Sequence, residues 1–168
     1  MGYDPAALTL ATIAALFDRQ GWRYQIIENH LVTVFDGVPI VVDVDDERAI
    51  VLLQTPIAPG RGMPGYLPTS AEAERDAAIY LLSVNYRLAL GAYTRDHKDG
   101  EIRYEISFPA AGTSVSEEQI LQAVSVIVAT MLSHAPVVNA LLTGRISLRQ
   151  ALDQLERGQG GLPPAMAV

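Results

Sequence analysis

The stretch Thr69–Pro109 constrains the fold of this chain most, because its hydrophobic period changes from that of a helix to that of a strand. Thr69 with Glu72 three residues later matches a capping box, and a nearly continuous apolar run follows over Ala77–Leu90. Apolar and polar side chains then alternate over Ile102–Phe108, which is typical of a strand with one buried face. The stretch therefore predicts a long helix that leads into a two-stranded hairpin.

The polar arc of this helix is narrow and is formed by Glu72, Asp76, Ser83 and Arg87. A helix that is apolar on most sides is expected to be covered on most sides, here by the sheet and by a second helix or a second subunit. Asn85 breaks the pattern, because it lies opposite the polar arc. An unpaired buried amide costs about 1–3 kcal/mol, so we expect the Asn85 side chain to bond backbone groups near Leu90-Gly91, with a ligand contact as the alternative.

The residues before this stretch predict a helix followed by an antiparallel meander. The helix starts between residues 5 and 9 and stops at Gly21, since glycine suits the C-terminal cap. Trp22–Thr55 is rich in β-branched and aromatic residues, and its connections are too short for parallel crossovers, so three or four antiparallel strands are expected. Asp36-Gly37 is a hairpin signal between two of them. The segment Pro56–Pro68, with four prolines and three glycines, predicts a long loop.

Helical patterns return after the hairpin. Ser114 or Ser116 is expected to cap a helix that ends at Ala135-Pro136, with a short helical turn at Val137–Leu142. Ser147, with Gln150 three residues later, caps a last helix. The final residues, 158–168, are expected to be a disordered tail. This order predicts an α+β fold, with a single domain over residues 1–157.

Composition and charge limit the classes of function. A net charge of −7 disfavours nucleic acid as a ligand, because phosphate binding needs clustered Lys and Arg. The chain has no cysteine, so disulfides, thiolate metal sites and Cys nucleophiles are excluded. Gln119–Gly144 carries no charged residue, but the polar residues within it favour a buried helix over a membrane span. No basic signal-peptide region precedes Arg19, and we expect a cytoplasmic protein without a membrane partner.

The loop contains one motif that could bind a cofactor. Gly60-Arg61-Gly62-Met63-Pro64-Gly65 matches the G-x-G-x-x-G pattern of dinucleotide-binding sites. That motif works only where a helix begins inside it and directs its N-terminus at a pyrophosphate. Pro64 and Pro68 interrupt such a start, and no βαβ unit surrounds the motif. A flexible loop is the favoured interpretation.

Carboxylates and histidines could hold a metal ion, but their spacing does not favour one. The acidic residues gather at two turns and are Asp43, Asp45, Asp46 and Glu47 in one and Asp96, Asp99 and Glu101 in the other. Neither group has the register of a calcium loop, so solvated turns are expected. His30 and His97 fall at predicted turns, and His134 falls near a predicted helix end, where a dipole contact is expected. The sequence therefore nominates no catalytic, cofactor-binding or metal-binding residue.

Several residues of the organising stretch together resemble a known family. Leu81, Leu82 and Asn85 on the helix are followed by Gly91 and Tyr93, the Asp99-Gly100 turn, Ile102 and Tyr104 on the strand, then Pro109, Gly112 and Glu117-Glu118. This order resembles the YbjN-type domain, a bacterial family connected with sensory transduction regulation and similar in fold to type III secretion chaperones. The resemblance implies a non-enzymatic homodimer that binds another protein or has a regulatory role. A strand at Trp22–Ile27, the Pro56–Pro68 loop and the last helix are additions to the basic chaperone plan.

Three hypotheses for function follow. The first is a dimeric, chaperone-like module that binds an unknown protein partner, because the helices carry more apolar surface than one small sheet needs. The second is a sensor of a small ligand, with a pocket under the Pro56–Pro68 loop. The third is an enzyme whose catalytic residues come from distant parts of the chain.

Overall fold

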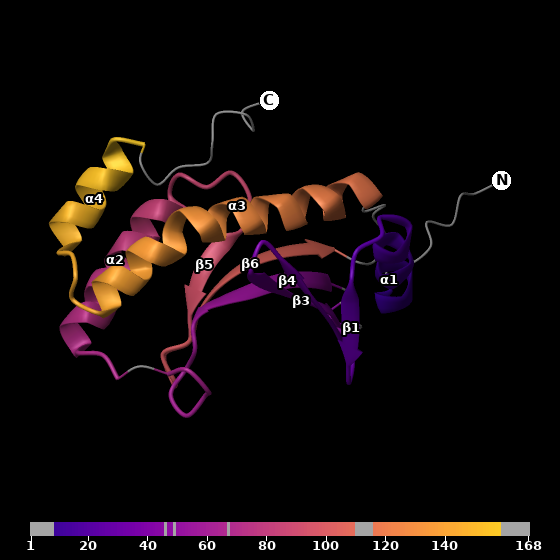
Figure 1. Cartoon of the computed structure of the whole chain (residues 1–168), viewed down its shortest axis with the longest axis horizontal. Coiled ribbons are helices and arrows are strands. Elements are labelled where there is room, and N and C mark those ends of the chain that lie inside the picture. The colour runs from indigo at the N-terminus through magenta and orange to yellow at the C-terminus, as the bar shows by residue number, and fades with distance from the viewer. Residues whose placement is uncertain (1–8, 46, 49, 67, 110–115, 159–168) are drawn as a thin grey trace. The chain divides into compact units, whose positions relative to one another are not determined.

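The computed structural model describes residues 9–45, 47–48, 50–66, 68–109 and 116–158. Its helices and strands follow the order α1, β1–β4, α2, β5, β6, α3, α4, and the strands form one sheet in the order β1-β2-β3-β4-β6-β5 (Figure 1). By their internal contacts, the residues fall into two compact units. Unit 1 comprises Met1–Thr55 with Glu105–Ile127, and unit 2 comprises Pro56–Tyr104 with Val128–Val168. The antiparallel α+β fold predicted from the sequence is confirmed, including the fourth strand of the meander.

Unit 1 contains helix α1 (Leu10–Arg19) and a meander of strands. The meander is formed by β1 (Tyr24–Ile27), β2 (His30–Phe35), β3 (Val38–Asp45) and most of β4 (Ile50–Ala58), and each strand is antiparallel to the next. Thr9 and Thr12 form a capping box at the start of α1, and Gly21 follows the helix with a φ of 69°. Asp36 and Gly37 both have positive φ, which is the geometry of a tight hairpin turn.

The buried face of this meander explains the alternation in its sequence. Leu31, Ile40, Val42, Val51 and Leu53 point to one side of the sheet and are fully buried. The helix α1 contributes Ile13, Leu16 and Phe17 to the same core. Because side chains alternate along a strand, this burial settles the register of the strands.

Unit 2 contains helix α2 (Ala71–Asn85), strand β5 (Ala92–Arg95) and the start of β6 (Ile102–Pro109). It also contains the C-terminal half of α3 (Glu117–Leu142) and helix α4 (Leu148–Glu156). Helix α2 packs against both β5 and α4 (Figure 1). The Arg87 side chain, just after α2, donates a hydrogen bond of 3.1 Å to the carbonyl of Leu155.

The structure corrects two predicted helix boundaries. Helix α3 does not end at Ala135-Pro136 but continues through Pro136 to Leu142. Pro136 is exposed, so water can satisfy the carbonyl that its missing N–H leaves unpaired. Helix α2 is capped by Ser70, whose side chain accepts from the N–H of Ala73, and not by Thr69. Thr69 instead donates its hydroxyl to Glu74 at 2.9 Å.

The other predicted caps and termini have mixed outcomes. Ser116 caps α3 and Ser147 caps α4, as the sequence predicted. Ser114, the first residues of the chain and the tail beyond Gly158 lie outside the described residues. Helix α3 has the length and the apolar composition of a membrane-spanning helix, but a core helix of a globular protein can have both as well. Ile120, Ile127, Met131 and Leu141 along α3 are buried.

Candidate functional site

The Asn85 side chain joins helix α2 to strand β5. Its Nδ2 donates to the Tyr93 carbonyl at 2.9 Å, and its Oδ1 accepts from the Tyr93 N–H at 2.8 Å. The amide thus pairs with the backbone of β5 as a neighbouring strand would. The expected structural role of Asn85 is confirmed, although the partner is Tyr93 and not the backbone near Leu90-Gly91.

We expect Asn85→Leu to destabilise the protein. The substitution leaves the N–H and the carbonyl of Tyr93 without the partners that Asn85 supplies, which costs about 1–3 kcal/mol in the free energy of unfolding. Denaturant unfolding followed by circular dichroism measures this loss. Asn139→Leu is the matched control, because Asn139 is exposed on α3, and it should change the free energy little. Equal stability of the two variants would contradict the structural role of Asn85.

A buried aromatic cluster in unit 2 surrounds the one histidine of the core. His134 is only 3% exposed, and its Nδ1 lies 2.9 Å from the hydroxyl oxygen of Tyr80. Tyr93 donates its hydroxyl to the Thr130 carbonyl at 3.2 Å, and Tyr104 donates its hydroxyl to the Leu90 carbonyl. The predicted dipole contact of His134 at a helix end is wrong, because α3 continues for two more turns beyond it.

Burial controls the protonation of this cluster. Desolvation lowers the pKa of His134 to about 4 and raises the pKa of Tyr80 to about 12. The pKa of Tyr93 is also raised, first by burial and then by the neighbouring tyrosines. At neutral pH both members of the Tyr80–His134 pair are therefore uncharged. The cluster is a satisfied part of the core, closed to solvent.

Helix α2 and its C-cap residue Tyr86 carry apolar side chains that none of the described residues covers. Tyr80, Leu81 and Val84 are buried, whereas Ile79 is 37%, Leu82 68% and Tyr86 94% exposed. Their spacing of three and four residues places them in one stripe, and a shallow depression lies along them. The predicted packing of this helix on the sheet and on a second helix is confirmed by its contacts with β5 and α4, but these contacts leave the stripe exposed. The remaining prediction, a second subunit on this face, is not tested by a single chain.

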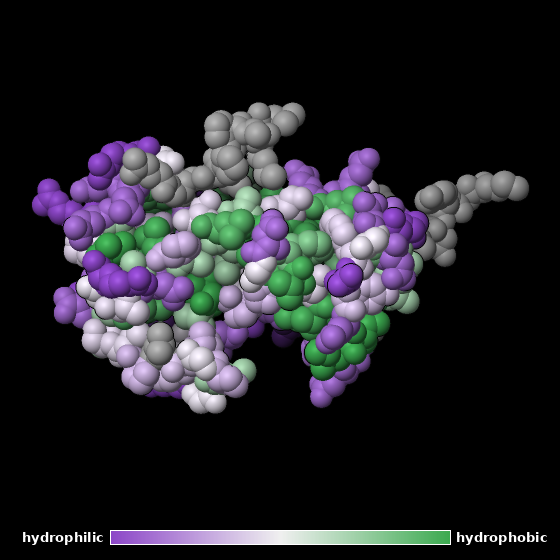
Figure 2. Space-filling view, in the orientation of Figure 1, coloured by the Kyte–Doolittle hydropathy of each residue, from purple (hydrophilic) through white to green (hydrophobic). Residues whose placement is uncertain are grey.

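Strand β1 offers a second exposed apolar surface, in unit 1. It lies at one end of the strand order, so one of its edges has no strand partner among the described residues. Ile26 and Ile27 on β1 are 54% and 51% exposed, and Val34 on the neighbouring strand is 62% exposed. Figure 2 shows a hydrophobic patch over β1 in this view. An edge strand with exposed β-branched residues can pair with an extended segment of another protein.

The predicted polar candidates fall into separate places. His30 lies on strand β2, not in a turn, and its Nδ1 bonds Oδ1 of Asp43. Asp43 also accepts from Nε2 of Gln54 at 2.6 Å. Asp45 accepts from the N–H of Arg48 at 2.9 Å. Asp43 and Asp45 thus each have a local partner on the sheet or in the turn that follows it.

The turn between β5 and β6 is held by its own acidic residues. Asp96 accepts from the Lys98 N–H at 2.7 Å, and Asp99 accepts from the Glu101 N–H at 2.9 Å. His97 is exposed beside Asp96. Within the part of the chain that the structure describes, no three His, Cys, Asp or Glu side chains come together as a metal site. Asp46 lies outside that part.

The glycine motif at 60–65 does not open a helix. The segment is a series of turns in which Gly62 and Gly65 have positive φ, and the helix begins only at Ala71. A Cβ atom at Gly60 would lie 2.4 Å from the Asp99 carboxylate, so this glycine allows the loop to approach the hairpin turn. The motif is therefore not at the start of a helix, as a dinucleotide site requires, and it lies in a loop that begins after Ala58, because β4 includes Pro56–Ala58 of the predicted Pro56–Pro68 loop.

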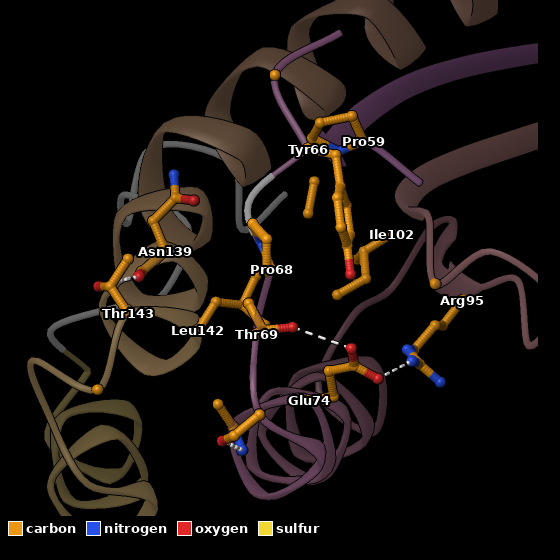
Figure 3. Close-up of a pocket in the computed structure, with 16 residues that line it drawn as sticks. Pro59, Tyr66, Pro68, Thr69, Glu74, Arg95, Ile102, Asn139, Leu142 and Thr143 are labelled. Carbon is orange, nitrogen blue, oxygen red and sulfur yellow. Dashed lines mark hydrogen bonds and ion pairs between the residues drawn. The ribbon is translucent and has the colours of Figure 1, made fainter. Parts of the chain in front are cut away.

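A cavity of about 510 Å³ lies beside this loop, entirely within unit 2. Loop residues from Pro59 to Ser70, the first turn of α2, β5, β6 and the end of α3 contribute to its walls. Figure 3 shows Tyr66 and Ile102 on one side of the cavity and Pro68 and Leu142 on the other. Glu74 lies on its floor, bonded to Thr69 and to Arg95 (Figure 3). The predicted pocket under the Pro56–Pro68 loop thus has a counterpart in the structure.

Comparison with solved structures places this architecture in a known class. Similar structures include YbjN from E. coli, which is 16% identical, with a TM-score of 0.53 and coverage of 84% of this chain and 95% of that chain. They also include the chaperone–effector complex of HopA1 and SchA, at 14% identity, with a TM-score of 0.55 and coverage of 80% and 99% of the two chains. No protein-family model matches this chain, and no curated protein matches it by sequence. The fold is that of YbjN and the type III secretion chaperones, as the resemblance implied.

Proposed function

We propose that this protein is a non-enzymatic, chaperone-like module that acts as a homodimer and binds another protein. The observation that carries the proposal is the exposed apolar stripe Ile79-Leu82-Tyr86 on α2. Side chains of this kind on a monomer's surface mark a contact with another chain. The similarity in fold to a chaperone–effector complex supports the same conclusion.

The α2 stripe fits a second copy of the same chain best. In a two-fold symmetric dimer, the same surface of each subunit forms the contact. The stripe on one α2 helix can therefore pack against the same stripe on the α2 helix of a second copy. Tyr86 and Leu82 have the size and exposure of anchor residues at an interface centre. The polar residues on the first turns of α2, Glu72, Arg75 and Asp76, form ion pairs among themselves and would stay at the rim.

Strand β1 is the proposed site for the partner protein. Its free edge can accept backbone hydrogen bonds from an extended segment, while Ile26 and Ile27 bury apolar side chains of that segment. This surface belongs to unit 1, and the α2 stripe belongs to unit 2. Dimerisation and partner binding can therefore be disturbed separately.

We expect Ile27→Glu to abolish capture of the partner and Gln25→Glu to leave it largely intact. Both residues are exposed on β1 and lie on the same face of the strand, but only Ile27 offers apolar surface. Burying the new carboxylate in an apolar contact weakens binding by at least about 2 kcal/mol, roughly thirtyfold in Kd. Tagged variants expressed in the native host, with mass spectrometry of bound proteins, measure the difference. Equal recovery of the same partner by both variants would contradict this assignment.

The proposal includes the absence of an enzymatic role and a cytoplasmic location, without nucleic-acid or membrane partners. The acidic net charge and the internally paired polar residues support it. Reproducible turnover by the purified protein, lost on substitution of a cavity residue such as Glu74, would overturn the non-enzymatic assignment. Sedimentation of the protein with lipid vesicles would overturn the absence of a membrane partner.

A further inference from the structure

The cavity beside the Pro59–Ser70 loop is separate from both surfaces of the proposed function. Its lining lies wholly within unit 2 and includes neither Leu82 nor any residue of β1. Its volume of about 510 Å³ falls within the range of sites that bind small molecules. The chemistry of its walls indicates which kind of molecule would fit.

The charged side chains that line the cavity, Glu74 and Arg95, form an ion pair with each other, and Arg61 of the loop lies 3.9 Å from the same carboxylate. Glu74 Oε2 accepts from Arg95 Nη2 at 2.6 Å, and Glu74 Oε1 accepts from the Thr69 hydroxyl at 2.9 Å. The two charged side chains are 19% and 31% exposed, so this pair is shielded from much of the solvent. A charged ligand would have to compete with a formed ion pair and would itself lose its hydration. The wall therefore favours a ligand without net charge.

The apolar walls suit a flat ring. Tyr66 extends from the loop next to Pro59 and towards Ile102, so that its ring forms one wall of the cavity (Figure 3). Pro68 and Leu142 form the opposite wall (Figure 3). Aromatic rings pack favourably against such flat aromatic and aliphatic surfaces. A planar molecule can be held between the two walls.

Two polar groups of the lining have hydrogen-bonding capacity left for a ligand. Among the described residues, neither the Tyr66 hydroxyl nor the Asn139 side-chain amide forms a side-chain hydrogen bond. The phenol and the amide can each donate and accept. A ligand with a carbonyl, amide or hydroxyl substituent can therefore be oriented within the otherwise apolar cavity.

We propose that this cavity is a binding site for an uncharged aromatic small molecule that carries a hydrogen-bonding substituent. Benzamide, benzoate and benzamidine test the proposal, because they share one ring and differ in charge. Each is titrated into ¹⁵N-labelled protein and followed by two-dimensional NMR. Benzamide is expected to shift the signals of Ala73, Gly100 and the Asn139 side chain, and to bind roughly tenfold more tightly than either charged analogue.

Substitutions in the loop locate the binding. Tyr66→Ala removes one wall and is expected to weaken benzamide binding roughly tenfold. Met63→Ala, at an exposed residue of the same loop outside the cavity, is the matched control and should bind as the unaltered protein does. Ala73→Phe fills the cavity from α2 and should remove the shifts without removing the loop.

Each contrary outcome overturns the proposal. Equal affinity for benzamide, benzoate and benzamidine would contradict the inference that the cavity favours an uncharged ligand. Shifts that map to other residues, unchanged binding by Tyr66→Ala and Ala73→Phe, or no shift at the solubility limit of benzamide would show that the cavity takes no such ligand. None of these results bears on dimerisation through α2 or on partner binding at β1, so failure of this proposal is distinguishable from failure of the proposed function.

Discussion

A Leu82→Glu variant is expected to be monomeric at concentrations where the unaltered chain is a dimer. Leu82 is 68% exposed, so its substitution leaves the core of unit 2 intact. In a two-fold contact of the α2 stripes, each carboxylate would be buried against apolar surface, and the two would lie near each other. A loss of at least about 2 kcal/mol per copy weakens association on the order of a thousandfold. Analytical ultracentrifugation over a concentration series measures the change.

Two further variants define the interpretation of that result. Tyr86→Glu, on the same stripe, should have an effect of similar size, because Tyr86 is 94% exposed and has the side chain of an interface anchor. Met63→Glu is the matched control, since it introduces the same charge at an exposed apolar residue of the loop. If Leu82→Glu and Met63→Glu associate equally well, or if the unaltered chain is a monomer at every concentration, the α2 stripe is not a dimer contact.

The second large effect is a loss of stability that we expect when the pH is lowered. His134 has a pKa of about 4 in the folded state, lowered from 6.5 because burial disfavours its charged form. Since the folded pKa lies below the unfolded one, the unfolded chain binds the proton first. The contribution to stability is therefore fully present above pH 6.5 and is lost progressively as the pH falls to about 4. The total loss from this one group is about 3 kcal/mol.

A pair of histidine variants isolates this contribution from that of the carboxylates, which also titrate in acid. His134→Gln removes the titrating group and should flatten the decline in the free energy of unfolding between pH 6.5 and 4. His97→Gln, at an exposed histidine in the turn after β5, should leave the decline unchanged. Denaturant unfolding at several pH values provides the comparison. Parallel curves for the unaltered chain and His134→Gln would contradict the assignment.

Features that depend on neighbouring residues could be predicted from the sequence. The Asp36-Gly37 turn, the Ser147 cap and the stop at Gly21 each depend on the conformation or the hydrogen bonds of a few adjacent residues. The period-two alternation of β6 was equally readable, because its buried face is one side of a strand. Asn85 was predictable for a related reason, since a buried amide must find a partner and the nearest free backbone belongs to the following strand.

Features that depend on residues far apart in the sequence could not be predicted from it. The continuation of α3 through Pro136 depends on the exposure of that proline, and its exposure depends on which elements the rest of the chain places around the helix. The burial of His134 follows from Tyr80 on another helix, 54 residues away in the sequence. The ion pair of Glu74 with Arg95 joins α2 to β5 and was missed, because nothing in the spacing of the two residues connects them.

Helix α2 shows what the sequence determines and what the tertiary structure adds. Its sequence by itself determined that the helix has a narrow polar arc, and hence more apolar surface than one partner element covers, because helical periodicity assigns each residue to a side. Only the tertiary structure decided which part of that apolar surface remains exposed to solvent. Ala77, Tyr80, Leu81 and Val84 are buried, with β5 and α4 packed on the helix and His134 of α3 against Tyr80, and the stripe Ile79-Leu82-Tyr86 remains exposed. The physical reason is that periodicity defines a direction around the helix axis, whereas burial depends on which elements the rest of the chain places there.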